Sequence, residues 1–138
     1  MSTQIFLNLA VKDLNKSISF FTKLGYTFNS QFTNDQATCM IISENIFVML
    51  LVEPFFKSFI KKEICDATKS TETIICLSAE SRQEVDSLIN KAKSAGATFP
   101  SEKSDQGFMY SHSFQDPDGH IWEIMYMDPA AIHQVNNN

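Results

Sequence analysis

Two ionisable side chains near the end of the sequence could do chemistry, Glu123 and His112. Glu123 interrupts the apolar run Ile121-Trp-Glu-Ile-Met-Tyr-Met127, and His112 lies in the segment before it. A carboxylate and an imidazole within hydrogen-bond distance can act together as an acid and a base. Glu123 alone is either a charged anchor for a cationic ligand or a solvated glutamate on an open sheet surface.

The turn Asp116-Pro-Asp-Gly119 joins these two segments, and its register decides whether Glu123 and His112 meet. A plain four-residue turn places His112 beside Glu123 on one face of the sheet. A shift of one residue moves His112 to the other face and brings Ser111 and Ser113 in its place. The sequence leaves both registers open.

The remaining histidines and the cysteines have no predicted chemical role. His120 follows the turn glycine and His133 lies in the polar tail. Three cysteines, none in C-x-x-C spacing, argue against a disulfide framework and favour a reducing, cytoplasmic compartment. Two of them, Cys39 and Cys76, lie in apolar runs and are interpreted as small core residues.

Composition limits the function classes further. The chain has 138 residues, 43% hydrophobic and 20% charged, which is typical of one globular domain. Its formal net charge of −5 argues against a nucleic-acid partner, which needs a basic surface. The sequence has no run of about 18 apolar residues, so we expect no membrane span. The first residues do not resemble a secretory signal.

Hydrophobic periodicity predicts the same order of elements in each half of the chain. Strand 5–11 alternates apolar and polar residues, and a helix follows from the N-cap Asp13 to Gly25. In the second half, strand 73–79 precedes a helix that starts at the capping box Ser81-Arg-Gln-Glu84 and ends at Gly96. The other predicted strands are 26–32, 37–43, 46–52, a short one from 98, 108–115 and 120–127.

The two halves also match in detail after their helices. The first reads Gly25-Tyr-Thr-Phe-Asn-Ser-Gln31 and the second Gly96-Ala-Thr-Phe-Pro-Ser-Glu102. This match predicts a duplicated βαβββ module. The expected fold class is therefore α+β, with a cupped mixed sheet and helices on its outer face. We predict one domain over 1–138, made of module one 4–53, a linker 54–71, module two 72–127 and a tail 128–138.

The linker contains an apolar stripe beside three lysines. Phe55, Phe56, Phe59 and Ile60 have the spacing of a short amphipathic helix. We expect this helix to pack on the sheet edge. The alternatives are a lid over the cup or part of a dimer contact.

With this duplication in view, the chain resembles the vicinal oxygen chelate superfamily, which includes glyoxalases, bleomycin-resistance proteins and extradiol dioxygenases. The resemblance rests on Leu9-Ala-Val-Lys-Asp-Leu14 leading into the first helix, on the repeated module, and on Asp116-Pro-Asp-Gly-His-Ile-Trp-Glu-Ile124. In fosfomycin-resistance relatives, the position that matches Ser113 faces the pocket, which favours the shifted register.

The resemblance implies a divalent metal held in the cup by side chains of the strands. Here only Glu123 matches a ligand. Phe6 and Ile74 (or Thr73) occupy the positions where the first strand of each module carries a metal ligand in the family. Met49 occupies the position in module one that corresponds to Glu123 in module two. One carboxylate does not make a transition-metal site, so we expect no cofactor, although a recruited divalent metal stays possible.

We therefore predict a metal-free, small-molecule-binding protein similar to the bleomycin-resistance proteins, and a homodimer as in the family. The alternatives are a lyase or another enzyme of the superfamily, using Glu123 with His112 or a recruited metal, and a structural protein with a collapsed cup. The expected ligand-binding residues line the cup: Phe6, Asn8, Met49, Ser111, Ser113, Glu123 and Met125.

Overall fold

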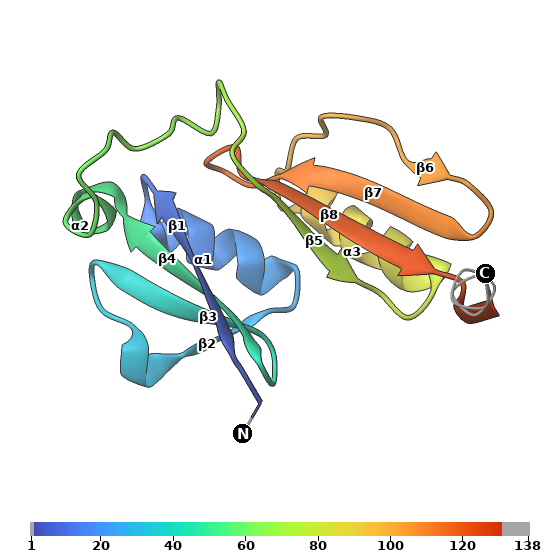
Figure 1. Cartoon of the computed structure of the whole chain (residues 1–138), viewed down its shortest axis with the longest axis horizontal. Helices are drawn as coiled ribbons and strands as arrows, with labels where there is room; N and C mark the ends of the chain where they lie inside the picture. The colour runs from blue at the N-terminus through green and yellow to red at the C-terminus, as the bar shows by residue number, and fades with distance from the viewer. Residues whose placement is uncertain (1, 131–138) are drawn as a thin grey trace. The chain divides into compact units, whose positions relative to one another are not determined.

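The computed structural model describes residues 2–130 and forms two compact units, Met1–Ser70 and Thr71–Asn138 (Figure 1). Their boundary falls inside the predicted linker. Each unit contains one four-stranded mixed sheet and one main helix, which confirms the predicted α+β class and the βαβββ order. Within residues 2–130, no helix is long and apolar enough to cross a membrane.

The first unit has the strand order β1-β4-β3-β2, with β1 parallel to β4 and the other pairs antiparallel. Its elements are β1 (Ile5–Val11), α1 (Leu14–Lys23), β2 (Thr27–Asn29), a 3-10 turn η1 (Ser30–Phe32), β3 (Ala37–Ser43), β4 (Ile46–Val52) and α2 (Glu53–Lys57).

Local signals in the sequence explain where α1 begins and ends. The carboxylate of Asp13 accepts a hydrogen bond from the backbone N–H of Lys16 at 3.1 Å, which caps the first turn. Gly25 has a φ of 103°, a left-handed conformation that stops the helix. The helix buries Phe20 and Phe21 in the core.

The predicted strand 26–32 is wrong in its second part, where η1 replaces it. The side chain of Asn29 accepts a hydrogen bond from the N–H of Gln31 at 3.0 Å, which turns the backbone away from the sheet. The predicted linker helix exists as the short α2, and it contacts β1 and β4, in agreement with packing on the sheet edge.

The second unit has the strand order β5-β8-β7-β6, with β5 parallel to β8. Its helix α3 begins after Ser81, which accepts a hydrogen bond from the N–H of Glu84 at 3.0 Å as the capping box predicts. The elements are β5 (Ile74–Ser78), α3 (Arg82–Ser94), β6 (Ser104–Asp105), β7 (Met109–Gln115) and β8 (Ile121–Met127).

The strand predicted from residue 98 is also wrong. Thr98 forms only an isolated bridge to Gln115, and the edge strand β6 starts six residues later at Ser104. Pro100 has no N–H to donate, so the chain cannot continue a ladder there. Residues 99–103 consequently form an irregular segment, which becomes important below.

The core of the second unit lies between its sheet and α3. Trp122, Phe114, Ile124 and Val85 are fully or almost fully buried, and the rings of Trp122 and Phe114 stack with centroids 6.4 Å apart. The alternate residues of each strand lie on the opposite face, away from α3.

Candidate functional site

The register of the β7–β8 hairpin fixes which side chains accompany Glu123. Ser113 lies opposite Glu123, and Ser111 lies opposite Met125. Residues directly opposite each other share a face, so these four side chains form one surface, here called the Glu123 face. It lies on the side of the sheet away from Trp122 and the core.

His112 lies opposite Ile124 and points to the helix-covered face. The plain-turn register is therefore wrong and the shifted register is correct. Gly119 has a φ of 91° and adds a residue to the turn, so that Gln115 pairs with Ile121. The expected pairing of His112 with Glu123 as acid and base is not formed.

The neighbour of Glu123 on its other side is a cysteine. Cys76 on β5 is the parallel partner of Glu123, and its Sγ lies 3.9 Å from Glu123 Oε1. Burial raises the pKa of the Cys76 thiol, and the charge and hydrogen bond of Glu123 raise it further. The interpretation of Cys76 as a core residue is wrong because its side chain is exposed, whereas Cys39 is buried as predicted.

Apolar side chains surround this polar row on the Glu123 face. Strand alternation places Ile74 beside Cys76, and Ile121 and Met125 on either side of Glu123. Ile74 is 57% exposed, which is unusual for a large aliphatic side chain. The face can therefore offer one negative charge within an apolar surround.

The expected binding residues of the first unit also share one face of their sheet. Asn8 lies beside Met49 and Phe6 beside Phe47, whose ring stacks on that of Phe6 with centroids 4.9 Å apart. Phe6 is 52% exposed. The Asn8 amide donates a hydrogen bond to the Phe6 carbonyl at 3.1 Å.

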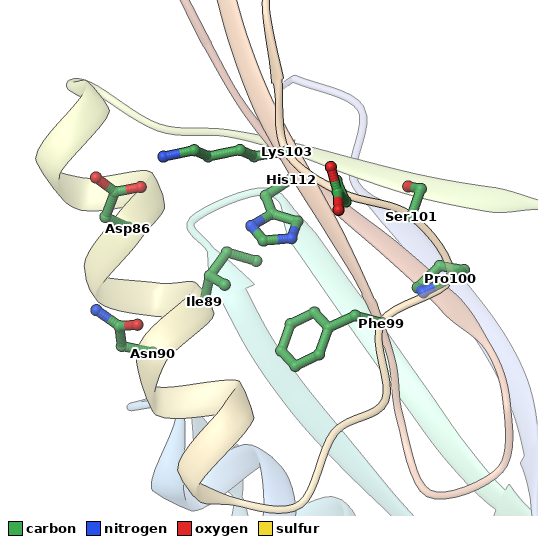
Figure 2. Close-up of a pocket in the computed structure, with 9 residues that line it drawn as sticks. Asp86, Ile89, Asn90, Phe99, Pro100, Ser101, Lys103 and His112 are labelled. Carbon is green, nitrogen blue, oxygen red and sulfur yellow. The ribbon is translucent and has the colours of Figure 1, made fainter.

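His112 lines a pocket of about 800 Å³ on the helix side of the second unit (Figure 2). The sequence did not predict this pocket. Its walls are α3, the segment 99–103 and β7. The lining side chains are Asp86, Ile89, Asn90, Phe99, Pro100, Ser101, Glu102, Lys103 and His112.

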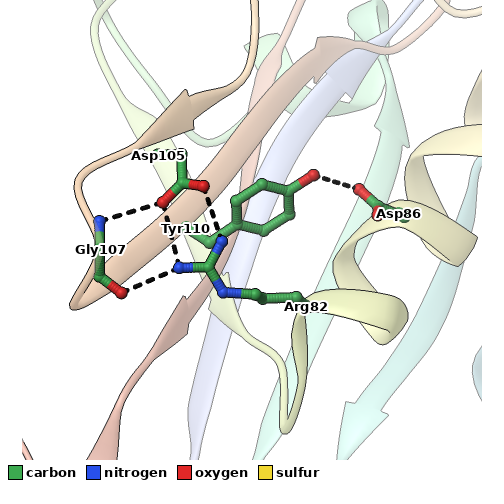
Figure 3. A network of polar contacts seen from close by, with 5 residues as sticks. All are labelled: Arg82, Asp86, Asp105, Gly107 and Tyr110. Atoms are coloured by element: carbon green, nitrogen blue, oxygen red, sulfur yellow. Dashed lines mark hydrogen bonds and ion pairs between the residues drawn. The ribbon is translucent and has the colours of Figure 1, made fainter.

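A polar network connects the start of α3 to the β6–β7 hairpin near this pocket (Figure 3). The guanidinium of Arg82 donates two hydrogen bonds to Asp105, at 2.8 and 3.0 Å, and one to the Gly107 carbonyl. It also lies 4.9 Å from the centre of the Tyr110 ring, whose hydroxyl donates to Asp86. The network holds the hairpin against the helix, and no sequence motif indicated it.

The other histidine among the described residues, His120, lies at the turn. The backbone N–H of His120 donates to the buried carboxylate of Asp116 at 3.1 Å, so this residue belongs to the turn. His133 lies outside the described residues.

A family comparison accounts for this architecture. Residues 4–124 match the family described as the Glyoxalase/Bleomycin resistance protein/Dioxygenase superfamily. The chain belongs to this superfamily. No curated protein matches it by sequence.

Solved structures of the superfamily and of related proteins have the same fold. The hypothetical protein SA1046 from S. aureus is 29% identical, with a TM-score of 0.77 over 91% of this chain and 95% of its own. A superfamily enzyme from Burkholderia phytofirmans PsJN is 13% identical, with a TM-score of 0.75 over 91% and 99%. The fosfomycin resistance protein FosX from Listeria monocytogenes is 21% identical, with a TM-score of 0.66 over 94% and 97%.

The side chains of this superfamily member do not fit the divalent metal that the family resemblance implies. Phe6, Ile74 and Met49 cannot donate a hard ligand, which leaves Glu123 alone among the four matching positions. Within residues 2–130, no three His, Cys, Asp or Glu side chains are grouped closely enough to hold a metal ion.

Proposed function

We propose that this superfamily member binds a small organic molecule on the Glu123 face without a metal. One observation carries the proposal: a single carboxylate lies between a thiol and a hydroxyl on a sheet face that also carries aliphatic, methionine and serine side chains. The ligand is a cation with an apolar body, because its charge would balance Glu123 while its body covers Ile74 and Met125.

The separation of His112 from Glu123 argues against the alternative of a lyase or other enzyme that uses both as acid and base. These two groups occupy opposite faces of one sheet and cannot act on the same bond. The structural relatives include a superfamily enzyme and a fosfomycin resistance protein, so they do not favour one activity for this chain.

The test compares hexylamine, which is protonated at pH 7, with hexanol. We expect hexylammonium to shift the backbone amide signals of Cys76, Glu123 and Met125 in NMR spectra, with roughly three- to tenfold weaker binding to Glu123→Gln. The matched control is Glu44→Gln, an exposed glutamate of the first unit. Equal binding of hexanol, or signals shifted elsewhere, contradicts the proposal.

Elemental analysis of the untagged protein tests the metal-free part separately. We expect no stoichiometric Zn, Mn, Fe, Co or Ni and no thermal stabilisation by these ions. A stoichiometric metal that is lost in Glu123→Ala would contradict it.

We also propose a cytoplasmic homodimer. The exposed thiols of Cys65 and Cys76 suit a reducing compartment, and the exposed Ile5, Phe6 and Ile46 at one end of the first sheet suit self-association. Light scattering after gel filtration tests the dimer, and a monomer at all concentrations up to the millimolar range would contradict it.

A further inference from the structure

Glu123 is not among the residues that line the pocket beside α3, although the hydroxyl of the lining residue Ser101 lies 3.2 Å from that of Ser113 on the Glu123 face. His112 lines the pocket from the helix side of β7 (Figure 2). Glu123 occupies the other face of the same sheet. A molecule in this pocket would not touch Glu123, so the two sites can be tested independently.

The imidazole of His112 lies beside Phe99 and the backbone of Ser101. Its ring lies 5.4 Å from the ring of Phe99, at an angle of 41°, and hydrogen bonding with the Ser101 backbone raises its pKa. A neutral imidazole has one donor and one acceptor nitrogen. No side chain among residues 2–130 forms a hydrogen bond with this imidazole, so its acceptor nitrogen can accept one from a ligand.

The surroundings keep this imidazole neutral. Burial lowers the pKa of His112, and the charge of Lys103 lowers it further, whereas Asp86 and the hydrogen bond with Ser101 partly oppose them. The charged groups that face the imidazole are Asp86 from α3, and Glu102 and Lys103 from the segment 99–103.

The pocket charges do not favour an ionic ligand. The carboxylate of Asp86 already accepts the Tyr110 hydroxyl at 2.5 Å, and Lys103 extends toward Asp86 with its ammonium 5.9 Å from the Tyr110 ring (Figure 2). Glu102 brings a second carboxylate to the lining. Lys103 would repel a cationic ligand, and the two carboxylates would repel an anionic ligand.

Apolar surface lies directly beside the imidazole of His112. Ile89 is almost fully buried, Phe99 is half-buried, and both side chains point into the space in front of the imidazole in Figure 2. A flat ring could pack against Phe99 and Ile89 while its edge reaches His112.

We propose that this pocket binds a neutral, flat molecule that donates one N–H or O–H hydrogen bond to His112 and packs its ring against Phe99 and Ile89. Affinity then falls as the solution becomes acidic, because protonated His112 offers only donors. A carboxylate ligand would show the opposite pH dependence.

The experiment uses indole, which is flat and neutral and has one N–H, together with 1-methylindole, which lacks that donor. In NMR titrations of the whole chain at pH 8, we expect indole to shift the signals of His112, Phe99 and Ile89 and to bind about tenfold more tightly than 1-methylindole. This difference should shrink as the pH falls through the pKa of His112 and disappear once the imidazole is protonated.

Two variants separate this pocket from the Glu123 face. His112→Phe keeps a ring in place and should reduce indole binding to the level of 1-methylindole, while Glu123→Gln should leave indole binding unchanged. Equal affinity for the two indoles at pH 8, or tighter binding of benzoate or benzylamine than of indole, overturns the proposal. These comparisons use the wild-type chain, so they decide the question even where His112→Phe does not fold.

Discussion

Ser113, not His112, lies opposite Glu123 across the β7–β8 hairpin. Glu123 therefore has a hydroxyl on one neighbouring strand and the thiol of Cys76 on the other. The imidazole faces α3 instead. A difference of one residue in the turn thus assigns the carboxylate and the imidazole to two separate surfaces.

The contact between Cys76 and Glu123 predicts the reactivity of the thiol. Since the Glu123 carboxylate contributes to the raised pKa of Cys76, Glu123→Gln should increase the thiolate fraction. We expect alkylation by iodoacetamide at pH 8 to become roughly two- to fivefold faster. Mass spectrometry in a Cys65→Ser background measures the rate at Cys76, because the third thiol, Cys39, is buried.

The matched control for this experiment is Glu44→Gln, which removes a carboxylate far along the sequence in the first unit. It should leave the rate unchanged. An identical pH profile for the wild type and Glu123→Gln would show that the carboxylate does not act on the thiol.

The Arg82–Asp105 ion pair makes a second prediction. Hydrogen bonds from Arg82, and to a smaller extent from the backbone N–H of Gly107, lower the pKa of Asp105 from 3.8 to about 2. Arg82→Gln should move this value back toward 3.8, as measured by carboxyl NMR. The control is Asp66, whose pKa is lowered mainly by hydrogen bonds from Thr68 and should not move.

The same pair affects acid stability in a defined direction. A carboxyl with a lower pKa in the folded state stabilises the fold above its unfolded-state pKa, and this contribution is lost as the pH falls. The stability difference between the wild type and Arg82→Gln should therefore be constant above pH 3.8 and shrink toward pH 2. A difference that persists at pH 2 would assign it to lost packing instead.

The sequence indicated the helices and most of the strands, but not the short edge strands or the face of every side chain. Asp13 and Ser81 marked the helix starts because capping is a local interaction. In strand 73–79, by contrast, consecutive apolar residues gave no alternation, so Cys76 was placed in the core. Cys76 is exposed because α3 packs on the other face of the sheet.

The hairpin register and the pocket beside α3 depend on three-dimensional structure. Both registers use the same turn residues, and the left-handed conformation of Gly119 decides between them. The pocket requires the irregular segment 99–103 to bring Phe99 against His112, which lies thirteen positions later in the sequence. No local pattern encodes such a contact.

The buried carboxylate of Asp116 predicts a large effect on stability. It accepts hydrogen bonds from the backbone of Asp118 and from the indole N–H of Trp122, at 2.9 and 3.0 Å. Asp116→Ala should lower the free energy of unfolding by about 2–4 kcal/mol. Trp122 is the single tryptophan, so its fluorescence during urea unfolding reports on this site. The exposed Asp35→Ala is the control and should change stability by about 0.5 kcal/mol or less.

The neutral state of His112 predicts how stability depends on pH between 7.5 and 5. Its pKa is lower in the folded chain than the ordinary 6.5, so the unfolded chain binds the proton more readily in this window. The stability of the wild type should fall as the pH falls through it, and that of His112→Gln should fall less. Asp66 and Asp105, whose pKa values are lowered, stay charged over the same range and do not contribute.

Urea unfolding at several pH values, followed by Trp122 fluorescence, measures this dependence. Parallel curves for the wild type and His112→Gln would mean that the imidazole is equally protonated in both states. Indole sharpens the comparison, because a ligand that binds only neutral His112 stabilises the fold at pH 7.5 more than at pH 5. The gap between the wild type and His112→Phe, which lacks the acceptor, should then widen with indole concentration at pH 7.5, and should widen less as the imidazole becomes protonated.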